Sequence, residues 1–207
     1  MKPIPTLYSI SLAIFCALFL TSAKADDIKL ESGNLGFLKG QTTICVKYAY
    51  DGMKVDNKTE EEFINFQVGE QNKGGAGKGE DWLSHWKNDR AGRYQPLFEE
   101  RINKVLHKRS VEVSPKATDA KYTLIMKVVA VHPGWAGWGL IHDGSRIDET
   151  ATFVETAQPE HVLAVISLKK VDGNGYDYNV FGRVSDAFGN CGKQLGHFLL
   201  DKKAFKN

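Results

Sequence analysis

The sequence predicts an α/β fold in which a mixed sheet combines one parallel crossover with an antiparallel three-strand meander, and helices pack on that sheet. Three observations predict it. An apolar strand pattern at 41–50 is followed by two helical patterns, three segments then alternate in polarity with period two, and a helical pattern closes the chain. A strand joined to the next one by helices implies a parallel, right-handed connection, whereas strands joined by short turns pair antiparallel.

The first 25 residues have the pattern of a secretory signal peptide. Lys2 supplies a positive start, 10–20 is an apolar run, and 23–25 (Ala-Lys-Ala) has the small residues of a cleavage site. An apolar helix of this length rises about 16 Å, too little to cross the roughly 30 Å hydrocarbon core of a bilayer. We therefore predict cleavage after Ala25, secretion or release into the periplasm, and a single domain at 26–207. An uncleaved anchor is the alternative.

The charges of the predicted mature chain balance. The whole sequence has 27 Lys and Arg against 25 Asp and Glu, and Lys2 and Lys24 lie in the predicted signal peptide. A balanced chain has no general attraction to nucleic acid or to anionic membranes. No later segment approaches the roughly 18 apolar residues of a membrane-spanning helix. We therefore expect no nucleic-acid partner and no transmembrane segment in the mature chain.

The first half of the mature chain is predicted to be mainly helical. The segment 26–40 is punctuated by glycine and is expected to be irregular, and the strand 41–50 has two largely apolar faces. Thr59 and Glu62 form a capping box that opens a helix, which the glycines of 72–79 end. A second helical pattern covers 80–108, with a break expected just before Pro96, because proline has no backbone N–H.

The second half changes to period two. A short strand is predicted around 111–113, and long strands at 122–132, 147–156 and 162–168, with a turn at 158–160 before the last of them. The final helix is predicted at 179–202. Gly189, Gly192 and Gly196 lie along one flank of it, which indicates close backbone packing against the sheet because interior glycines otherwise cost about 1 kcal/mol each.

Two cysteines remain in the predicted mature chain. Cys16 leaves with the signal peptide, unless the chain is a lipoprotein acylated there. Cys45 and Cys191 lie on the first strand and the last helix, both in apolar settings. In an oxidising compartment one disulfide between Cys45 and Cys191 is expected, provided that the two elements face each other. Two buried thiols that act as small apolar side chains are the alternative.

A glycine-rich connection at 133–139 carries the candidate binding residues. Trp135 and Trp138 are costly to expose, and in such a loop they are placed to stack on sugars, dock a partner protein or touch a lipid surface. His132 and His142 flank the connection and complete the predicted binding set. The alternative is that the two tryptophans fold back and cover the sheet.

Motifs for chemistry are weak. The loop 74–79 lacks the first glycine and the Ser or Thr of a phosphate-binding loop. A zinc site would need His132 and His142 with Asp143 or Asp148, and solvated loop histidines are the alternative. His142, Asp143 and Ser145 are too near each other in the chain to converge as a triad. We therefore predict no catalytic residues, no metal and no cofactor.

Four short stretches carry a resemblance to known proteins. They are 37–40 (Phe-Leu-Lys-Gly), 122–125 (Tyr-Thr-Leu-Ile), 153–157 (Phe-Val-Glu-Thr-Ala) and 192–196 (Gly-Lys-Gln-Leu-Gly). In these stretches the chain resembles a group of small secreted proteins of unknown function from Bacteroidetes-type bacteria. More distantly, its order of elements resembles the α/β domains of envelope-assembly lipoproteins such as the curli secretion family. The resemblance implies a fold and an exported location, and it implies no catalytic residue.

These observations favour an exported, non-enzymatic protein of the bacterial envelope with a binding or assembly role. The partner is expected to be an envelope protein or a glycan, contacted through the loop that holds Trp135 and Trp138. The alternative is a secreted hydrolase with a dispersed site of histidine and carboxylate groups.

Overall fold

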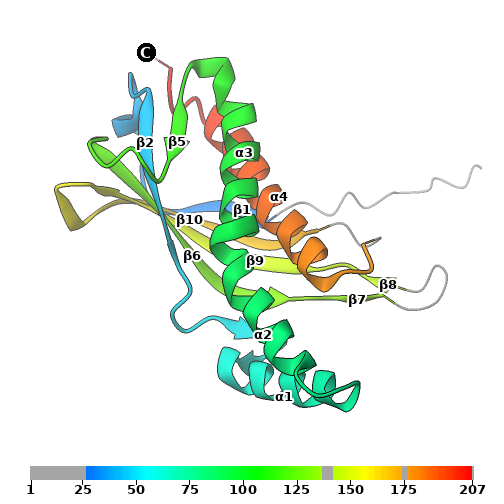
Figure 1. The fold of residues 1–207 in the computed structure, drawn as a ribbon. Coiled ribbons are helices and arrows are strands. Elements are labelled where there is room, and N and C mark those ends of the chain that lie inside the picture. Colours follow the sequence, from blue (N-terminus) through cyan, green and yellow to red (C-terminus); the bar gives the residue numbers. More distant parts are fainter. Residues whose placement is uncertain (1–26, 137–141, 174–176, 207) are drawn as a thin grey trace, which may run out of the picture.

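The computed structural model describes residues 27–136, 142–173 and 177–206. It confirms the predicted α/β fold: a mixed sheet carries helices packed against it (Figure 1). The predicted signal peptide and its cleavage site lie outside the described residues. Within the described ranges, no helix has the length and apolarity needed to cross a membrane.

The main sheet confirms the predicted topology. Its strand order is β1-β10-β9-β6-β2-β5, with β2 parallel to both β5 and β6 and with β6, β9 and β10 forming the antiparallel meander. A small hairpin of β3 and β4 joins this sheet by the parallel pairing of β3 with β6. The bounds are Asp27–Gly33 (β1), Thr43–Ala49 (β2), Lys54–Val55 (β3), Lys58–Thr59 (β4), Glu112–Ser114 (β5), Tyr122–His132 (β6), Arg146–Glu155 (β9) and Gln158–Asp172 (β10).

Two predictions about the strands are wrong. The segment 26–40 is not irregular throughout, because β1 pairs antiparallel with β10 and a 3₁₀ turn (η1, Gly36–Leu38) follows it. The register of this pair shifts between Leu30 and Ser32. The turn predicted at 158–160 lies at 156–157 instead, and β10 begins at Gln158, so that a tight two-residue turn joins β9 to β10.

The helical half has three helices, a π-helical turn before the third of them and a 3₁₀ turn (η3, His107–Arg109) after it. The capping box of Thr59 and Glu62 is formed at the start of α1, Glu60–Lys73. The next helices are α2, Lys78–Asp89, and α3, Gln95–Leu106, and a π-helical turn (η2, Arg90–Tyr94) separates them. This turn is the break predicted before Pro96, which cannot donate a backbone hydrogen bond and therefore sits in the first turn of α3.

The last helix, α4 (Val180–Asp201), lies beside α3 over the same face of the sheet (Figure 1). Its glycines pack against α3 and not against the sheet, which corrects the prediction. A Cβ atom built on Gly192 would lie 2.4 Å from the backbone oxygen of Phe98, and one on Gly189 would meet the side chain of Arg101. Glycine is needed here because the two helix backbones approach more closely than any side chain allows.

Replacing Gly192 by alanine is therefore expected to lower the free energy of unfolding by about 2 kcal/mol, because α3 and α4 must move apart. The matched control is Gly69→Ala on α1, where an added Cβ meets no atom within 4 Å. That change is expected to raise stability by about 0.5–1 kcal/mol through helix propensity. Urea unfolding of both variants measures the difference. Equal effects would show that the α3–α4 contact can accommodate an added methyl group.

The core lies between the sheet and the helices. On β2, β6 and β9, alternate side chains point at α3 and α4, as the pleat of a strand requires. The hydroxyl of Tyr48 on β2, for example, donates to Oε1 of Glu99 on α3 at 3.1 Å. The largest fully buried side chains are Phe98, Phe153, Phe188, Leu38, Ile44, Ile102, Leu106, Leu124, Met126, Ile147, Ile166 and Leu168.

The expected disulfide is not formed. Cys45 and Cys191 are both free and buried. Cys45 is three residues from Tyr48 on the same strand, so its side chain points to the face of the sheet away from the helices. Cys191 on α4 lies against Glu149 on the helix-facing side, and burial raises the pKa of its thiol well above the ordinary value. The sheet itself separates the two sulfur atoms, and the alternative of two buried thiols holds.

Candidate functional site

The candidate site is the end of the sheet where the pairing of β6 with β9 stops, at His132 and Arg146. There the chain forms a separate two-stranded ribbon of β7 (Trp135–Ala136) and β8 (His142–Asp143). Trp135 has 49% of its surface exposed. Trp138 and the side chain of His142 lie outside the described part of the structure.

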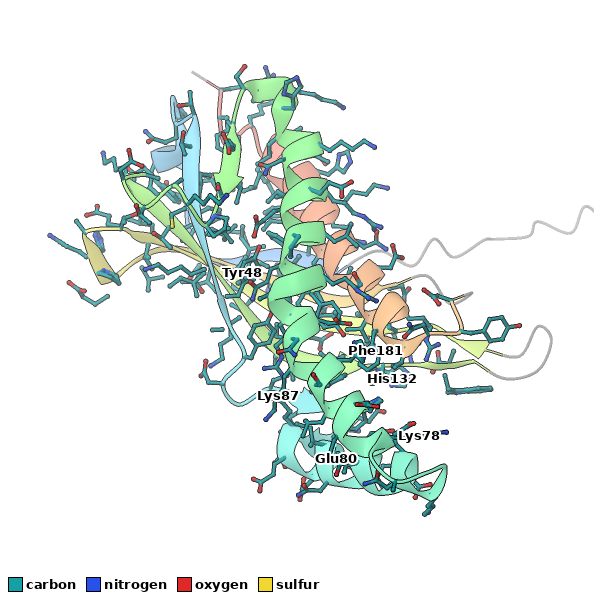
Figure 2. The ribbon with its side chains drawn as sticks, in the orientation of Figure 1. Tyr48, Lys78, Glu80, Lys87, His132 and Phe181 are labelled. Carbon is teal, nitrogen blue, oxygen red and sulfur yellow. The ribbon has the colours of Figure 1, made fainter. Side chains whose placement is uncertain are left out.

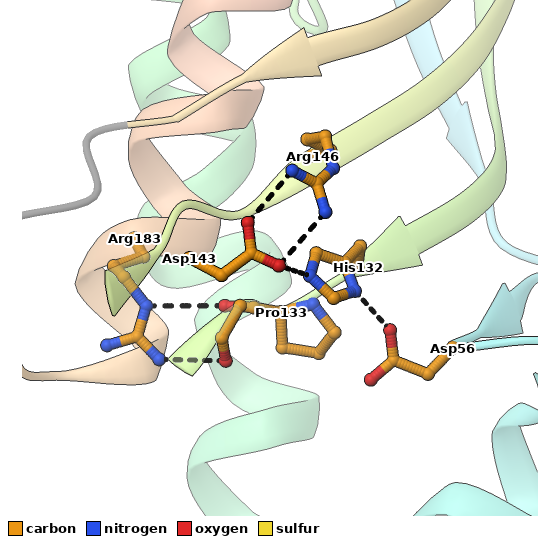
Figure 3. A network of polar contacts seen from close by, with 7 residues as sticks. Asp56, His132, Pro133, Asp143, Arg146 and Arg183 are labelled. Atoms are coloured by element: carbon orange, nitrogen blue, oxygen red, sulfur yellow. Dashed lines mark hydrogen bonds and ion pairs between the residues drawn. The ribbon is translucent and has the colours of Figure 1, made fainter. Parts of the chain in front are cut away.

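Arg183, in the first turn of α4, holds the base of this ribbon. Its side chain is almost fully buried, with 3% of the residue exposed. Nη2 donates to the carbonyl oxygen of Gly134 at 3.1 Å and Nε to that of Pro133 at 3.3 Å (Figure 3). Nη1 donates to the carbonyls of Asp177 and Tyr178 at 2.7 and 3.1 Å. One guanidinium thus joins the backbone that precedes Trp135 to the segment that leads into α4.

An exposed tyrosine lies on the second of these segments. Tyr178 has 76% of its surface exposed, and its carbonyl shares the Arg183 guanidinium with that of Gly134. Trp135 follows Gly134 directly. Two exposed aromatic residues, Trp135 and Tyr178, are therefore attached to backbone segments that converge on one buried cation.

His132 is the centre of a second polar network at the same end. Its Nε2 pairs with Oδ2 of Asp143 at 2.7 Å, and its Nδ1 pairs with Oδ1 of Asp56 (Figure 3). Both oxygens of Asp143 also accept from the guanidinium of Arg146, at 2.9 and 3.1 Å. The Arg146 hydrogen bonds, together with the contact from His132, hold the pKa of Asp143 below its ordinary value, although burial acts in the opposite direction.

Asp56 reaches His132 because of a tight turn. Asp56 and Asn57 form the two-residue loop between β3 and β4, and both have left-handed backbones, with φ of 49° and 64°. Asp and Asn tolerate this conformation, which a type I′ hairpin requires at both central positions. The backbone N–H of Asp56 also donates to the carbonyl of Val131 at 3.1 Å. The turn therefore brings a carboxylate from the first half of the chain to the end of β6.

This arrangement is suited to holding structure and not to proton transfer. Each ring nitrogen of His132 already has a carboxylate partner, so neither is left to act on a substrate. Ser145 is fully buried, and its Oγ donates to the carbonyl of Arg183 at 2.6 Å, which removes it as a nucleophile. The network therefore gives no support to the alternative of a hydrolase built on these histidines and carboxylates.

The structure also places the residues of the zinc hypothesis. Asp143 pairs with His132 and Arg146, whereas Asp148 accepts from the backbone N–H of Lys170 at 2.7 Å and lies apart from that network. Among the described residues, no group of three His, Cys, Asp or Glu side chains is arranged to hold a metal ion. The described residues thus join His132 and Asp143 but assemble no ligand set.

The glycine-rich loop at 74–79 connects two helices. Gly79, near the start of α2, packs closely against α1, because an added Cβ would lie 2.6 Å from the carbonyl oxygen of Val68. Its backbone N–H donates to Oδ1 of Asn72 at 2.8 Å. Gly79 therefore has a packing role at the junction of α1 and α2.

Sequence reasoning missed Asp56, Arg146, Arg183 and Tyr178. A usable signal existed for two of them. Val-Asp-Asn-Lys at 55–58 is a hairpin-turn sequence, and Arg183 interrupts the apolar face of a strongly amphipathic helix. Arg146 and Tyr178 have no local signal, because their roles depend on contacts across the fold.

Fold and site together define a class: an α/β protein whose sheet end carries an exposed aromatic ribbon anchored by a buried arginine.

No protein-family model matches the chain, and no curated protein is similar to it in sequence. Among solved structures, the chain is similar to two PelC dodecamers from Paraburkholderia phytofirmans. The first has 9% identity and a TM-score of 0.40 over 80% of this chain and 96% of that chain. The second, a point variant, has 10% identity and a TM-score of 0.39 over 81% and 97%.

A third solved structure is similar to a smaller part. It is a Xanthomonas campestris protein that matches the DUF330 family model, with 11% identity and a TM-score of 0.33 over 52% of this chain and 61% of that chain. Identities near one residue in ten and TM-scores of this size describe a distant likeness. They assign no function to this chain.

Proposed function

We propose that the chain is an exported, non-enzymatic protein of the bacterial envelope that binds a partner protein or a glycan through the glycine-rich connection that contains Trp135 and Trp138. The half-exposed indole of Trp135 on backbone that Arg183 holds in place carries this proposal. Aromatic side chains contribute much of the energy of binding interfaces, and they do so best on a surface that is ordered before the partner arrives.

The surroundings of Trp135 suit a contact surface. The network of Asp56, His132, Asp143 and Arg146 fixes the strand ends from which the ribbon starts. Trp135 and Tyr178 supply large exposed aromatic surfaces on the two backbone segments that Arg183 joins. An indole and a phenol offer both an apolar face and a polar tip, a combination that suits sugar rings and mixed protein surfaces.

Export supports the choice of partner. The signal-peptide pattern of 1–25 and the resemblance to secreted proteins both favour a location in the envelope or outside the cell. Cell-envelope proteins and glycans are the macromolecules that such a protein meets. Mass spectrometry of the exported form is expected to find Asp26 as the first residue, and an intact Met1 would contradict cleavage.

Replacing Trp135 and Trp138 together by serine tests the binding role. We expect crosslinked partner in a pull-down from the native envelope to fall strongly, while the melting temperature changes by no more than about 4 °C, because Trp135 is half-exposed. The control is Phe66→Ser on α1, where an aromatic side chain of similar exposure, 54%, lies away from the ribbon.

Two outcomes would contradict the binding role. A melting temperature lower by ten degrees or more in the double variant would mean that the indoles support the core, at roughly 2–4 °C per kcal/mol for a domain of this size. An unchanged pull-down would remove the ribbon as the contact surface.

A further inference from the structure

A basic groove runs between the outer sides of α3 and α4. It has a volume of about 620 Å³, and its basic lining consists of Arg101 and Lys104 from α3, Lys108 from the 3₁₀ turn that follows α3 (His107–Arg109), and Lys193 and His197 from α4. A second hollow of about 480 Å³ adjoins it and shares Lys193 and His197. In a chain whose charges balance overall, this local excess of cations needs its own explanation.

Helix geometry gathers these side chains. Arg101 and Lys104 are three residues apart and begin a row along α3, which Lys108 continues in the 3₁₀ turn after that helix. Lys193 and His197 form a second row one turn apart on α4. The glycine contacts of α4 with α3 bring the two rows together, because the helix backbones touch at Gly192. Figure 2 shows long side chains on the outer sides of both helices.

Most of this charge is available to a ligand. Arg101 is tied to Asp186 and to Oδ1 of Asn190, the latter at 2.5 Å. Lys104, Lys108 and Lys193 are exposed, and within the described residues none of them has an ion pair. Two carboxylates also line the groove among the described residues, Glu100 in the larger hollow and Asp201 in the smaller one.

We propose that this basic groove binds a segment of a linear anionic polysaccharide, whose carboxylate or sulfate groups pair with Lys104, Lys108 and Lys193. Two adjoining hollows that share Lys193 and His197 suit a chain-like ligand better than a single small anion. The proposed exported location, on which the choice of a glycan rests, places the groove among such polymers.

Other polyanions fit less well. Among the described residues no Phe, Tyr or Trp lines the larger hollow, and Phe198, which lines the smaller hollow beside His197, has Lys202 over its ring at 5.4 Å. Single-stranded nucleic acid needs open aromatic faces on which its bases stack. A flat anionic bilayer meets a concave surface poorly, and the large exposed apolar side chains of the described residues lie elsewhere.

The test measures binding of the purified full chain by calorimetry. The probes are polygalacturonate and dextran sulfate, with uncharged dextran, phosphatidylglycerol vesicles and oligodeoxythymidylate as comparisons. The groove variant is Lys104→Glu with Lys193→Glu, and the control is Lys47→Glu with Lys87→Glu, which changes the net charge equally at exposed positions on β2 and α2. A second variant, Lys104→Gln with Lys193→Gln, serves if charge reversal impairs folding.

We expect both anionic polysaccharides to bind and uncharged dextran not to bind. The groove variant should raise Kd by about tenfold or more, while the control should change it by less than about twofold, and added salt should weaken binding. Trp135→Ser should leave this binding unchanged, because the ribbon anchor at Arg183 lies about 15 Å along α4 from Lys193. That result separates the groove from the ribbon.

Three outcomes overturn the proposal. They are absence of polysaccharide binding, equal weakening in the groove and control variants, and tighter binding to the vesicles or to the oligonucleotide than to either polysaccharide.

Discussion

Arg183→Met is expected to lower the free energy of unfolding by about 3 kcal/mol. The guanidinium is buried and donates to four backbone carbonyls, those of Pro133, Gly134, Asp177 and Tyr178. Methionine preserves much of the apolar stem but donates nothing, so these carbonyls lose a charged donor at a site that water reaches poorly. Urea unfolding followed by circular dichroism measures the loss.

The control for this prediction is Arg109→Met. Arg109 is exposed in the short 3₁₀ turn after α3, and its replacement should change stability by less than about 0.5 kcal/mol. The Arg183 variant should also bind its partner more weakly at the ribbon, because Gly134 precedes Trp135 directly. Unaltered stability in Arg183→Met would mean that the ribbon does not depend on this anchor.

Glu149 is expected to make the protein less stable as the pH rises from about 5 to 8. It lies on β9 in the helix-facing core with 2% of its surface exposed, and within the described residues neither carboxyl oxygen has a hydrogen-bond partner of good geometry. Burial raises its pKa to about 8, while the thiol of Cys191 acts weakly in the opposite direction. The folded protein therefore keeps a proton on Glu149 at neutral pH.

The sign follows from proton linkage. Between the ordinary pKa of 4.5 and the folded value of about 8, the unfolded chain has lost the Glu149 proton and the folded chain has kept it. The folded state then binds more protons, so the free energy of unfolding falls with rising pH through this window and becomes level above it. At pH 7 the loss attributable to Glu149 is about 3 kcal/mol.

Glu149→Gln tests this expectation because it keeps the size of the side chain and removes the titration. Its stability relative to the natural protein should rise by about 3 kcal/mol between pH 4.5 and pH 7. Glu100→Gln, at an exposed position on α3, is the control and should show no such rise. Parallel pH profiles for the natural protein and Glu149→Gln would show that the carboxyl reaches a donor in solution.

Local patterns predicted much of the fold. The alternation at 122–132 marked β6 with the bounds that the structure has, and Thr59 with Glu62 marked the start of α1, because both signals act over a few residues. The strand β1 was missed. Its pairing with β10 depends on residues far along the chain, and its sequence carries charged residues typical of an edge strand.

The errors about helix packing and cysteines share one cause. Periodicity shows which residues share a face of an element, but it does not say which neighbour that face meets. Gly192 was correctly expected at a close contact, and the partner proved to be α3 and not the sheet. Cys45 and Cys191 were expected on facing elements, but the sheet lies between them, and both are free and buried.

The candidate site was predicted in part. Trp135 and His132 stood out because of residue type and glycine-rich surroundings, and the structure places them at the same end of the sheet. Their partners Asp56 and Arg183 lie 76 and 51 residues from His132 in the sequence, and only the fold brings them there. Glu149 had a local signal, a lone carboxylate among the buried positions of β9.

The pairing of β1 with β10 has a consequence for how the chain folds. Asp27 pairs with Lys169. One of the first residues of the predicted mature chain therefore cannot form its strand pair until one of the last strands is present. Contacts of such large sequence separation form late, because the entropy of closing the loop must be overcome first. A growing chain cannot complete its sheet before 158–172 has been synthesised. The segment 27–33 therefore lacks its strand partner until most of the chain has left the ribosome.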